Sequence, residues 1–345
     1  MRTFQLSKPP FFRSVFFTLL SLLLPLLLAV PFAPAQSCTT QAEMDAGTRN
    51  KLENAALFMA RQVSADKAPA NTPAIQASIA PQVASQAAGI LASVASAAGK
   101  VQGAAFTVRN LYILDASSGA ANQSTQFFCG SMNLPPHVVF TLGGLQPGKY
   151  GIAIVEATSI ARPQQMTIIF EQSPLAAEWK LAGFSYKPST MAGHNGDWYW
   201  KQARMYAQKK ENWNSYFYYK TARFLLVPVD FLSSSNLDKL LREEHAVKPA
   251  GLPGASPMPL TGGNQSFSVT DLHTDSFSGG LDLVIRYTTK SVQDPVATRR
   301  DNIAVMHLLL QAHPELRQAF HGLWVYAVAP GQDPFGIELP MDQIP

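Results

Sequence analysis

Apolar residues at steps of three and four predict two amphipathic helices early in the chain. The first covers 41–63. The second begins with Thr72 as its N-cap and carries an apolar stripe from Ile75 to Val94. Pro81 falls inside that stripe, so we expect the second helix to be kinked or split there.

From residue 106 to residue 186 the apolar period changes to two, which predicts β-strands. A Leu-Gln-Pro-Gly sequence at 145–148 is a strong turn between two of these strands. Two helices followed by consecutive antiparallel strands predict an α+β domain in which the N-terminal helices pack on a curved antiparallel sheet. The expected strands are 106–115, 126–132, 137–142, 150–157, 165–171 and 178–186.

This order of elements over 41–187 resembles the cystatin-like and nuclear-transport-factor-two-like domains. The sequence Trp-Lys-Leu-Ala-Gly-Phe at 179–184 is similar to the closing strand of such domains. The resemblance implies a cone-like sheet that wraps around a long helix. The Leu-x-Pro-Gly-x-Tyr sequence at 145–150 is also similar to a turn of β-sandwich modules, so a small β-sandwich remains the alternative fold.

The helical period returns in two short helices that a turn at Glu211-Asn212 separates. We expect Asp197 to cap the first helix, which ends near Lys210, and the second helix to run from Trp213 to Leu226. A third helix over 235–246 carries three leucines and is expected to cover this hairpin.

The spacing of small and aromatic residues in the hairpin resembles one tetratricopeptide repeat. Gln202 and Pro228 depart from that repeat, and we find no second copy at its period of about 34 residues. The resemblance implies two closely packed helices that cannot bury their own face alone, so we expect the hairpin to pack against the preceding domain. The matching positions are Tyr199, Ala203, Tyr206, Ser215, Tyr219 and Ala222.

Proline and glycine crowd the segment 247–263, which predicts a solvated linker. Beyond it, strands at 266–272 and 281–288, a helix at 297–312 capped by Asp294, and strands at 323–329 and 335–339 predict a small ββαββ unit. The expected organisation is a signal peptide at 1–35, a cone-like α+β domain at 36–190, the hairpin and its capping helix at 191–246, a linker at 247–263 and a small α+β domain at 264–345.

The N-terminus has the order of a secretory signal peptide. Three basic residues precede an uncharged apolar run at 14–30, and Ala33-Pro34-Ala35 follows it. We expect cleavage after Ala35 and therefore a periplasmic or secreted protein. The alternative is that 14–30, which is seventeen residues long, stays uncleaved as a membrane anchor.

The balance of charges bears on whether the protein binds nucleic acid. The chain has 27 basic and 23 acidic residues, and without the three basic residues of the signal segment the net charge falls from +4 to +1. This balance gives no reason to expect nucleic-acid binding.

Cys38 and Cys129 predict a disulfide in an oxidising compartment. The alternative is two unpaired thiols, with Cys129 buried beside Phe127 and Phe128.

The sequence contains no catalytic, nucleotide-binding or metal-binding motif, so we expect no cofactor and no metal. Glu156 is the single catalytic candidate. It shares a strand face with Ile152 and Ile154, and a desolvated acid inside the cone would be a site for acid–base chemistry. The alternatives are that Glu156 lies in solvent or pairs with Arg109.

Ten aromatic residues crowd 198–224, more than one packing face can cover. Trp198, Trp200, Trp213 and Tyr216 are therefore candidates for contact with a ligand or partner, and a two-sided core is the alternative. We predict an exported, non-catalytic protein-interaction or scaffold module whose partner is another exported or envelope protein. The alternatives are small-molecule or glycan binding in the cone-like domain, and an enzyme that uses Glu156.

Overall fold

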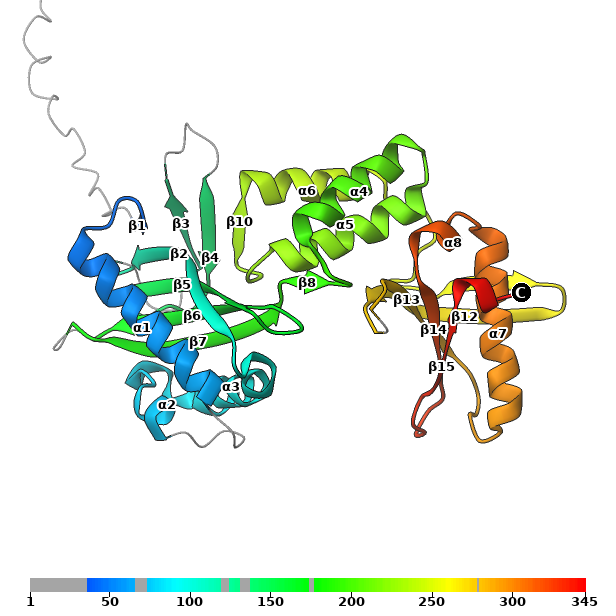
Figure 1. The fold of residues 1–345 in the computed structure, drawn as a ribbon, viewed down its shortest axis with the longest axis horizontal. Coiled ribbons are helices and arrows are strands. Elements are labelled where there is room, and N and C mark those ends of the chain that lie inside the picture. The colour runs from blue at the N-terminus through cyan, green and yellow to red at the C-terminus, as the bar shows by residue number, and fades with distance from the viewer. Residues whose placement is uncertain (1–35, 66–72, 119–123, 131–136, 174–176, 278) are drawn as a thin grey trace, which may run out of the picture. The chain divides into compact units, whose positions relative to one another are not determined.

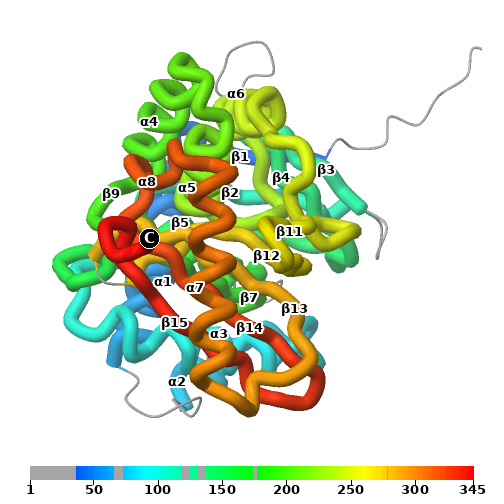
Figure 2. The backbone as a smooth tube through the Cα atoms, turned by 90° about the vertical axis from the view of Figure 1, so that its right-hand side faces the viewer, coloured from blue at the N-terminus to red at the C-terminus, as the bar shows by residue number. Residues whose placement is uncertain are grey.

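The computed structural model describes residues 36–65, 73–118, 124–130, 137–173, 177–277 and 279–345. The signal segment at 1–35, the N-cap expected at Thr72 and the end of the strand expected at 126–132 lie outside these residues. The fold is a mixed α+β fold, as the sequence predicts (Figures 1 and 2). Among the described residues, no helix combines the length and the apolar character that crossing a membrane requires.

A five-stranded antiparallel sheet carries helices on one face in the first half of the chain (Figure 1). Helices α1 (Ala46–Ala65) and α3 (Ala87–Val101) bury Leu52, Val94 and their neighbours against it. The strands, in spatial order, are β1 (Ser37–Thr40), β2 (Ala105–Asp115), β5 (Lys149–Thr158), β6 (Gln164–Gln172) and β7 (Trp179–Pro188).

Pro81 splits the second expected helix, as predicted. The chain forms α2 (Pro73–Ala77), then a 3₁₀ helix η1 (Pro81–Gln86), then α3. Pro81 opens η1 because a proline lacks the N–H that a helix interior requires, while the first turn leaves that group free in any case.

A small sheet covers the second face of the five-stranded sheet. It consists of β3 (Thr125–Cys129), β4 (Val138–Leu142) and β10 (Leu232–Ser234), in the order β10-β4-β3. Phe127 and Phe140 of this sheet are fully buried in one cluster with Ile152 and Ile154 of β5. The disulfide between Cys38 and Cys129, with a Cα–Cα distance of 4.9 Å, joins β1 to β3, which confirms the predicted pairing.

The helical hairpin forms where the sequence predicts it. Helices α4 (Gly196–Gln208) and α5 (Asn212–Leu226) are followed by α6 (Ser235–Ala246), and a two-stranded ribbon of β8 (Thr190–Met191) and β9 (His194–Asn195) precedes them. The cap of α4 differs from the prediction. The side chain of Asn195, and not that of Asp197, accepts the N–H of Trp198 at 3.0 Å, because Asn195 holds the extended backbone that an N-cap requires.

The C-terminal part is a second five-stranded sheet with helix α7 (Pro295–Ala312) packed on it. Its strands, in order, are β11 (Met258–Gly262), β12 (Gln265–Asp275), β13 (Asp282–Thr288), β14 (Gly322–Val328) and β15 (Phe335–Pro340), and β13 and β14 run parallel. Two short helices, α8 (Leu316–Ala319) and η2 (Met341–Gln343), complete it. Strand β11 lies inside the segment that the sequence predicts to be a linker. A strand forms there because Met258 and Leu260 are apolar, alternate with exposed residues and are buried.

The hairpin shares its main core with the C-terminal sheet and not with the preceding domain, which corrects the expectation from sequence. Tyr218 donates its hydroxyl hydrogen to the carbonyl of Ala319 at 2.6 Å, and the rings of Phe217 and Phe320 lie 6.3 Å apart. Most aromatic side chains of the hairpin, including Tyr199 and Tyr206, are buried in one cluster with residues of the C-terminal sheet. The hairpin therefore packs mainly on the C-terminal part.

Candidate binding cleft

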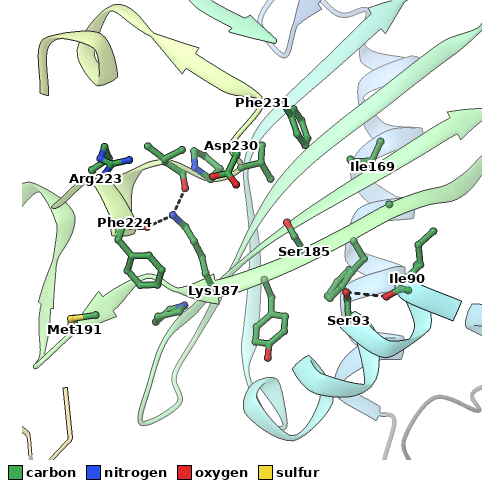
Figure 3. A pocket seen from close by; sticks show the side chains of 18 of the residues that line it. Ile90, Ser93, Ile169, Ser185, Lys187, Met191, Arg223, Phe224, Asp230 and Phe231 are labelled. Carbon is green, nitrogen blue, oxygen red and sulfur yellow. Dashed lines mark hydrogen bonds between the residues drawn. The ribbon is translucent and has the colours of Figure 1, made fainter. Parts of the chain in front are cut away.

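A cavity of about 1050 Å³ lies along the outer edge of β7 (Figure 3). One wall comes from η1 and α3, and the other comes from the end of α5 and the loop 227–231. The last residues of β12, His273 to Asp275, complete the lining. The cleft therefore lies where the N-terminal sheet, the hairpin and the C-terminal sheet meet.

The edge of β7 is covered only in part. Leu181 donates its N–H to Ser78 at 2.7 Å and accepts the N–H of Ala80 at 2.8 Å. Beyond Leu181, no strand within the described ranges pairs with this edge of the sheet. Ser189 donates to Pro163 at 3.0 Å across the β6 side, and alternation along an antiparallel ladder then turns the main-chain groups of Phe184 and Tyr186 away from β6. The cleft thus offers main-chain donors and acceptors.

Side chains of β7 alternate between the two walls of the cleft. Tyr186 lies on the α3 side, where its hydroxyl is 2.7 Å from Ser96 Oγ and accepts a hydrogen bond from Lys100 Nζ at 2.9 Å. Burial raises the pKa of Tyr186, but the hydrogen bonds from Lys100 and Ser96 outweigh burial and leave that pKa below its usual value. These contacts hold the open half of β7 against α3.

Lys187 crosses to the opposite wall. Its ammonium donates to the carbonyls of Phe224 and Val227, which are free acceptors at the C-terminal end of α5, and lies 5.5 Å from the centre of the Phe224 ring (Figure 3). Burial lowers the pKa of Lys187 to about 8, although the charge of Asp230 acts in the opposite direction. Lys187 therefore ties the sheet edge to the hairpin while its charge is poorly solvated.

Apolar side chains give the cleft its surface. Phe224 is 48% exposed, and the cleft is also lined by Ile90, Ile169 and Phe231. The cation of Arg223 is held by the buried Glu244, with 2.7 Å between Arg223 Nε and Glu244 Oε2. This combination of apolar walls and an open strand edge suits the binding of an extended chain.

Glu156 does not line this cleft. Its Oε1 lies 3.1 Å from Arg109 Nε, so the structure shows the pairing that was the alternative from sequence. Arg109 lies at a β-bulge of β2, which directs its side chain toward Glu156 on β5. The face on which Ile152 and Ile154 lie is filled by the small sheet and its aromatic residues.

Two of the four aromatic candidates are buried inside the protein. Trp213 and Tyr216 are each 8% exposed, and Trp213 stacks on His313 with 3.8 Å between ring centres. Trp198 and Trp200 are partly buried. Trp198 stacks on His194 at 3.7 Å between ring centres.

Trp200 takes part in a network that holds α4 to α6. Its indole N–H donates to Glu243 Oε2 at 2.7 Å, and the guanidinium of Arg204 lies 4.5 Å from the centre of its ring. Arg204 also donates two hydrogen bonds to the Glu243 carboxylate, each at 2.8 Å. These polar partners keep Trp200 in place against the helices of its own chain.

Sequence reasoning missed Lys187, and none of its four aromatic candidates lines the cleft. Phe224 belongs to the same aromatic run as the four candidates, and its place in the last turn of α5 puts it beside β7. No signal in the sequence marks Lys187, because a lysine in the closing strand of a sheet is ordinary. The open edge of β7 depends on the order of strands, which the sequence pattern does not state.

Comparison of the chain with protein-family models, with curated proteins and with solved structures finds no match.

Proposed function

We propose that this protein is an exported, non-catalytic binding module that captures an extended segment of a partner protein in the cleft along β7. The observation that carries the proposal is the open outer edge of β7 beyond Leu181, which borders a cavity of about 1050 Å³. An extended peptide that adds to a sheet edge gains main-chain hydrogen bonds, while pockets beside the edge select alternate side chains.

Export is supported by two features of the chain. The basic start, apolar run and small-residue exit of 1–35 form a signal-peptide pattern. The disulfide between Cys38 and Cys129 is a bond that persists in oxidising compartments. The partner is accordingly another exported or envelope protein.

The dimensions of the cleft favour a peptide over a compact small molecule. Typical small-molecule pockets measure about 300–1,000 Å³, and this cavity of about 1050 Å³ is slightly larger than that range. The open part of β7 runs from Gly183 to Pro188, and strand residues advance about 3.3 Å each, so the edge accepts several residues of an added strand. Because Phe224, Ile169 and Phe231 line the walls, we expect apolar side chains at alternate positions of the bound segment.

Selection from a displayed library of random linear peptides tests this function. We expect the purified protein to enrich sequences with alternating apolar residues, and synthetic copies of them to bind. Phe224→Ala should abolish that binding, whereas Phe58→Ala should leave it unchanged. Phe58 is the matched control because it is 51% exposed on α1, against 48% for Phe224, and does not line the cleft.

A second pair of variants tests the main-chain part of the proposal. Tyr186→Pro removes an N–H that faces away from β6, so it should prevent strand addition while the β6–β7 ladder remains. Tyr186→Phe keeps the ring and the N–H and should bind as the parent protein does. Failure to select any peptide, or binding to the Phe224→Ala and Tyr186→Pro variants as tight as to the parent protein, would refute the proposal. Binding of a soluble oligosaccharide in the same cleft would favour the glycan alternative.

A further inference from the structure

Three side chains with metal-ligating atoms meet at one edge of the C-terminal sheet. Asp282 is the first residue of β13, His321 directly precedes β14, and Glu338 lies on β15 opposite Trp324 of β14. Because β13 and β14 are parallel, their starting ends lie at the same edge of the sheet, and the antiparallel β15 ends there (Figures 1 and 2). One ligand atom from each residue lies within 4.8 Å of the other two.

The carboxylate of Asp282 is buried, and one of its two oxygens lacks a hydrogen-bond donor among the described residues. Asp282 is 0% exposed, and its Oδ1 lies 3.1 Å from His321 Nδ1. Its Oδ2 is buried and has no hydrogen-bond partner among the residues that the structure describes. A buried carboxylate oxygen without a donor is costly, and coordination of a cation removes that cost. The free oxygen of Asp282 is thus an observation separate from the clustering of the three residues.

Among the described residues, no lysine or arginine lies close enough to pair with either carboxylate. Two carboxylates that share a site repel each other unless a positive charge lies between them. A divalent ion supplies that charge and uses the lone pairs of all three side chains.

The backbone leaves room for this arrangement. A Cβ on Gly322 would lie 3.2 Å from Asp282 Oδ1 and 2.9 Å from the carbonyl oxygen of Leu339. A Cβ on Gly280 would lie 2.3 Å from the Cβ of His321. The absence of a Cβ at both positions therefore leaves the space in which Asp282 and His321 lie beside each other.

We propose that Asp282, His321 and Glu338 bind a divalent transition-metal ion, with Zn²⁺ as the ion to test. An imidazole nitrogen with two carboxylate oxygens is a donor set that Zn²⁺ accepts, at distances of about 2.0–2.2 Å. Three atoms no more than 4.8 Å apart lie within about 3 Å of a common point, so rotations of the more accessible His321 and Glu338 bring them to coordination distance. Three protein ligands leave a coordination position for water.

The site does not depend on the cleft along β7. None of its three ligands lines that cavity. The sequence shows no metal motif because the ligands are separated by about 39 and 17 positions, and only the strand order brings them together.

Zinc titration of the full exported protein tests this site. The protein is stripped with a chelator, desalted and titrated with ZnCl₂ in competition with a chromogenic chelator. We expect one equivalent to bind, and His321→Ala and Glu338→Gln each to weaken the affinity by at least about tenfold. Both substituted side chains are accessible to solvent, so these variants should fold, which circular dichroism checks.

His273→Ala is the matched control. His273 Nδ1 lies 2.7 Å from Asp271 Oδ2 on the same sheet, but no third ligand completes that pair within the described residues. The control should bind zinc as the parent protein does. Co²⁺ gives a second readout, since the parent protein should develop a visible absorption band that His321→Ala lacks. The proposal is overturned if the stripped parent protein binds no zinc, or if His321→Ala and Glu338→Gln bind it as tightly as the parent.

Discussion

The disulfide between Cys38 and Cys129 should supply a large share of the stability of the N-terminal part. It joins β1, which is four residues long, to β3 across a separation of 91 residues. In the chain-entropy treatment, a loop of that length constrains the unfolded chain by about 4–5 kcal/mol. We therefore expect the double variant Cys38→Ala/Cys129→Ala to lose up to that free energy of unfolding. Alanine is the suitable replacement because Cys129 is buried in an apolar cluster, where serine would add an unpaired hydroxyl.

Urea unfolding followed by tryptophan fluorescence measures the effect. The oxidised parent protein should unfold at a higher urea concentration than the double variant, and the variant should show a steeper dependence on urea because its unfolded chain is less constrained. Reductant should lower the midpoint of the parent and leave that of the variant unchanged. Equal midpoints, or alkylation of two thiols without prior reduction in an intact-mass measurement, would refute the reasoning.

Three further perturbations have distinct expected outcomes. Burial lowers the pKa of Lys187 from its ordinary 10.5 to about 8 in the folded protein. The unfolded chain therefore binds more protons between these two pH values, and the free energy of unfolding should rise with pH there. A pH series of urea unfolding should show that rise flattened in Lys187→Met, and parallel pH curves would contradict it. Asn302→Ala should lower the free energy of unfolding by about 1–3 kcal/mol, because the buried Asn302 accepts from Tyr287 Oη at 2.9 Å and donates to the carbonyl of Val325 at 3.0 Å. Arg109→Ala should lower it by less than about 1 kcal/mol in the same assay, since the pair with Glu156 is exposed to solvent, and a larger loss would show that the pair does more than bridge the surface.

Local pattern was sufficient to predict most helices and strands. Helix α6 begins and ends at the predicted residues, 235 and 246, because Ser234 accepts the N–H of Leu237 as N-cap and the apolar stripe stops at the same place. Asp294 caps α7 as expected and accepts the N–H groups of Val296 and Ala297. Capping chemistry and apolar period depend on neighbours within one or two turns, and the sequence states both directly.

Features that depend on distant pairing were not predictable in this way. The sequence predicts a linker where β11 lies because prolines and glycines surround its two buried residues, and only its pairing with β12 makes it a strand. The cluster of Asp282, His321 and Glu338 likewise exists because three strands meet at one edge. Proline content and local residue spacing say nothing about which strands become neighbours.

The hairpin explains why the cleft lies beside β7. A single pair of helices cannot bury all of its apolar surface and needs neighbours on several sides. The C-terminal part covers the side that holds Phe217 and Tyr218, and α6 buries Leu240 in the same cluster. The last turn of α5 is left with an exposed Phe224 at the point where β7 has an open edge. Within the described part of the chain, the exposed ring of Phe224 and main-chain groups of β7 that pair with no strand thus border the same cavity. One extended peptide could cover that ring and pair with those groups.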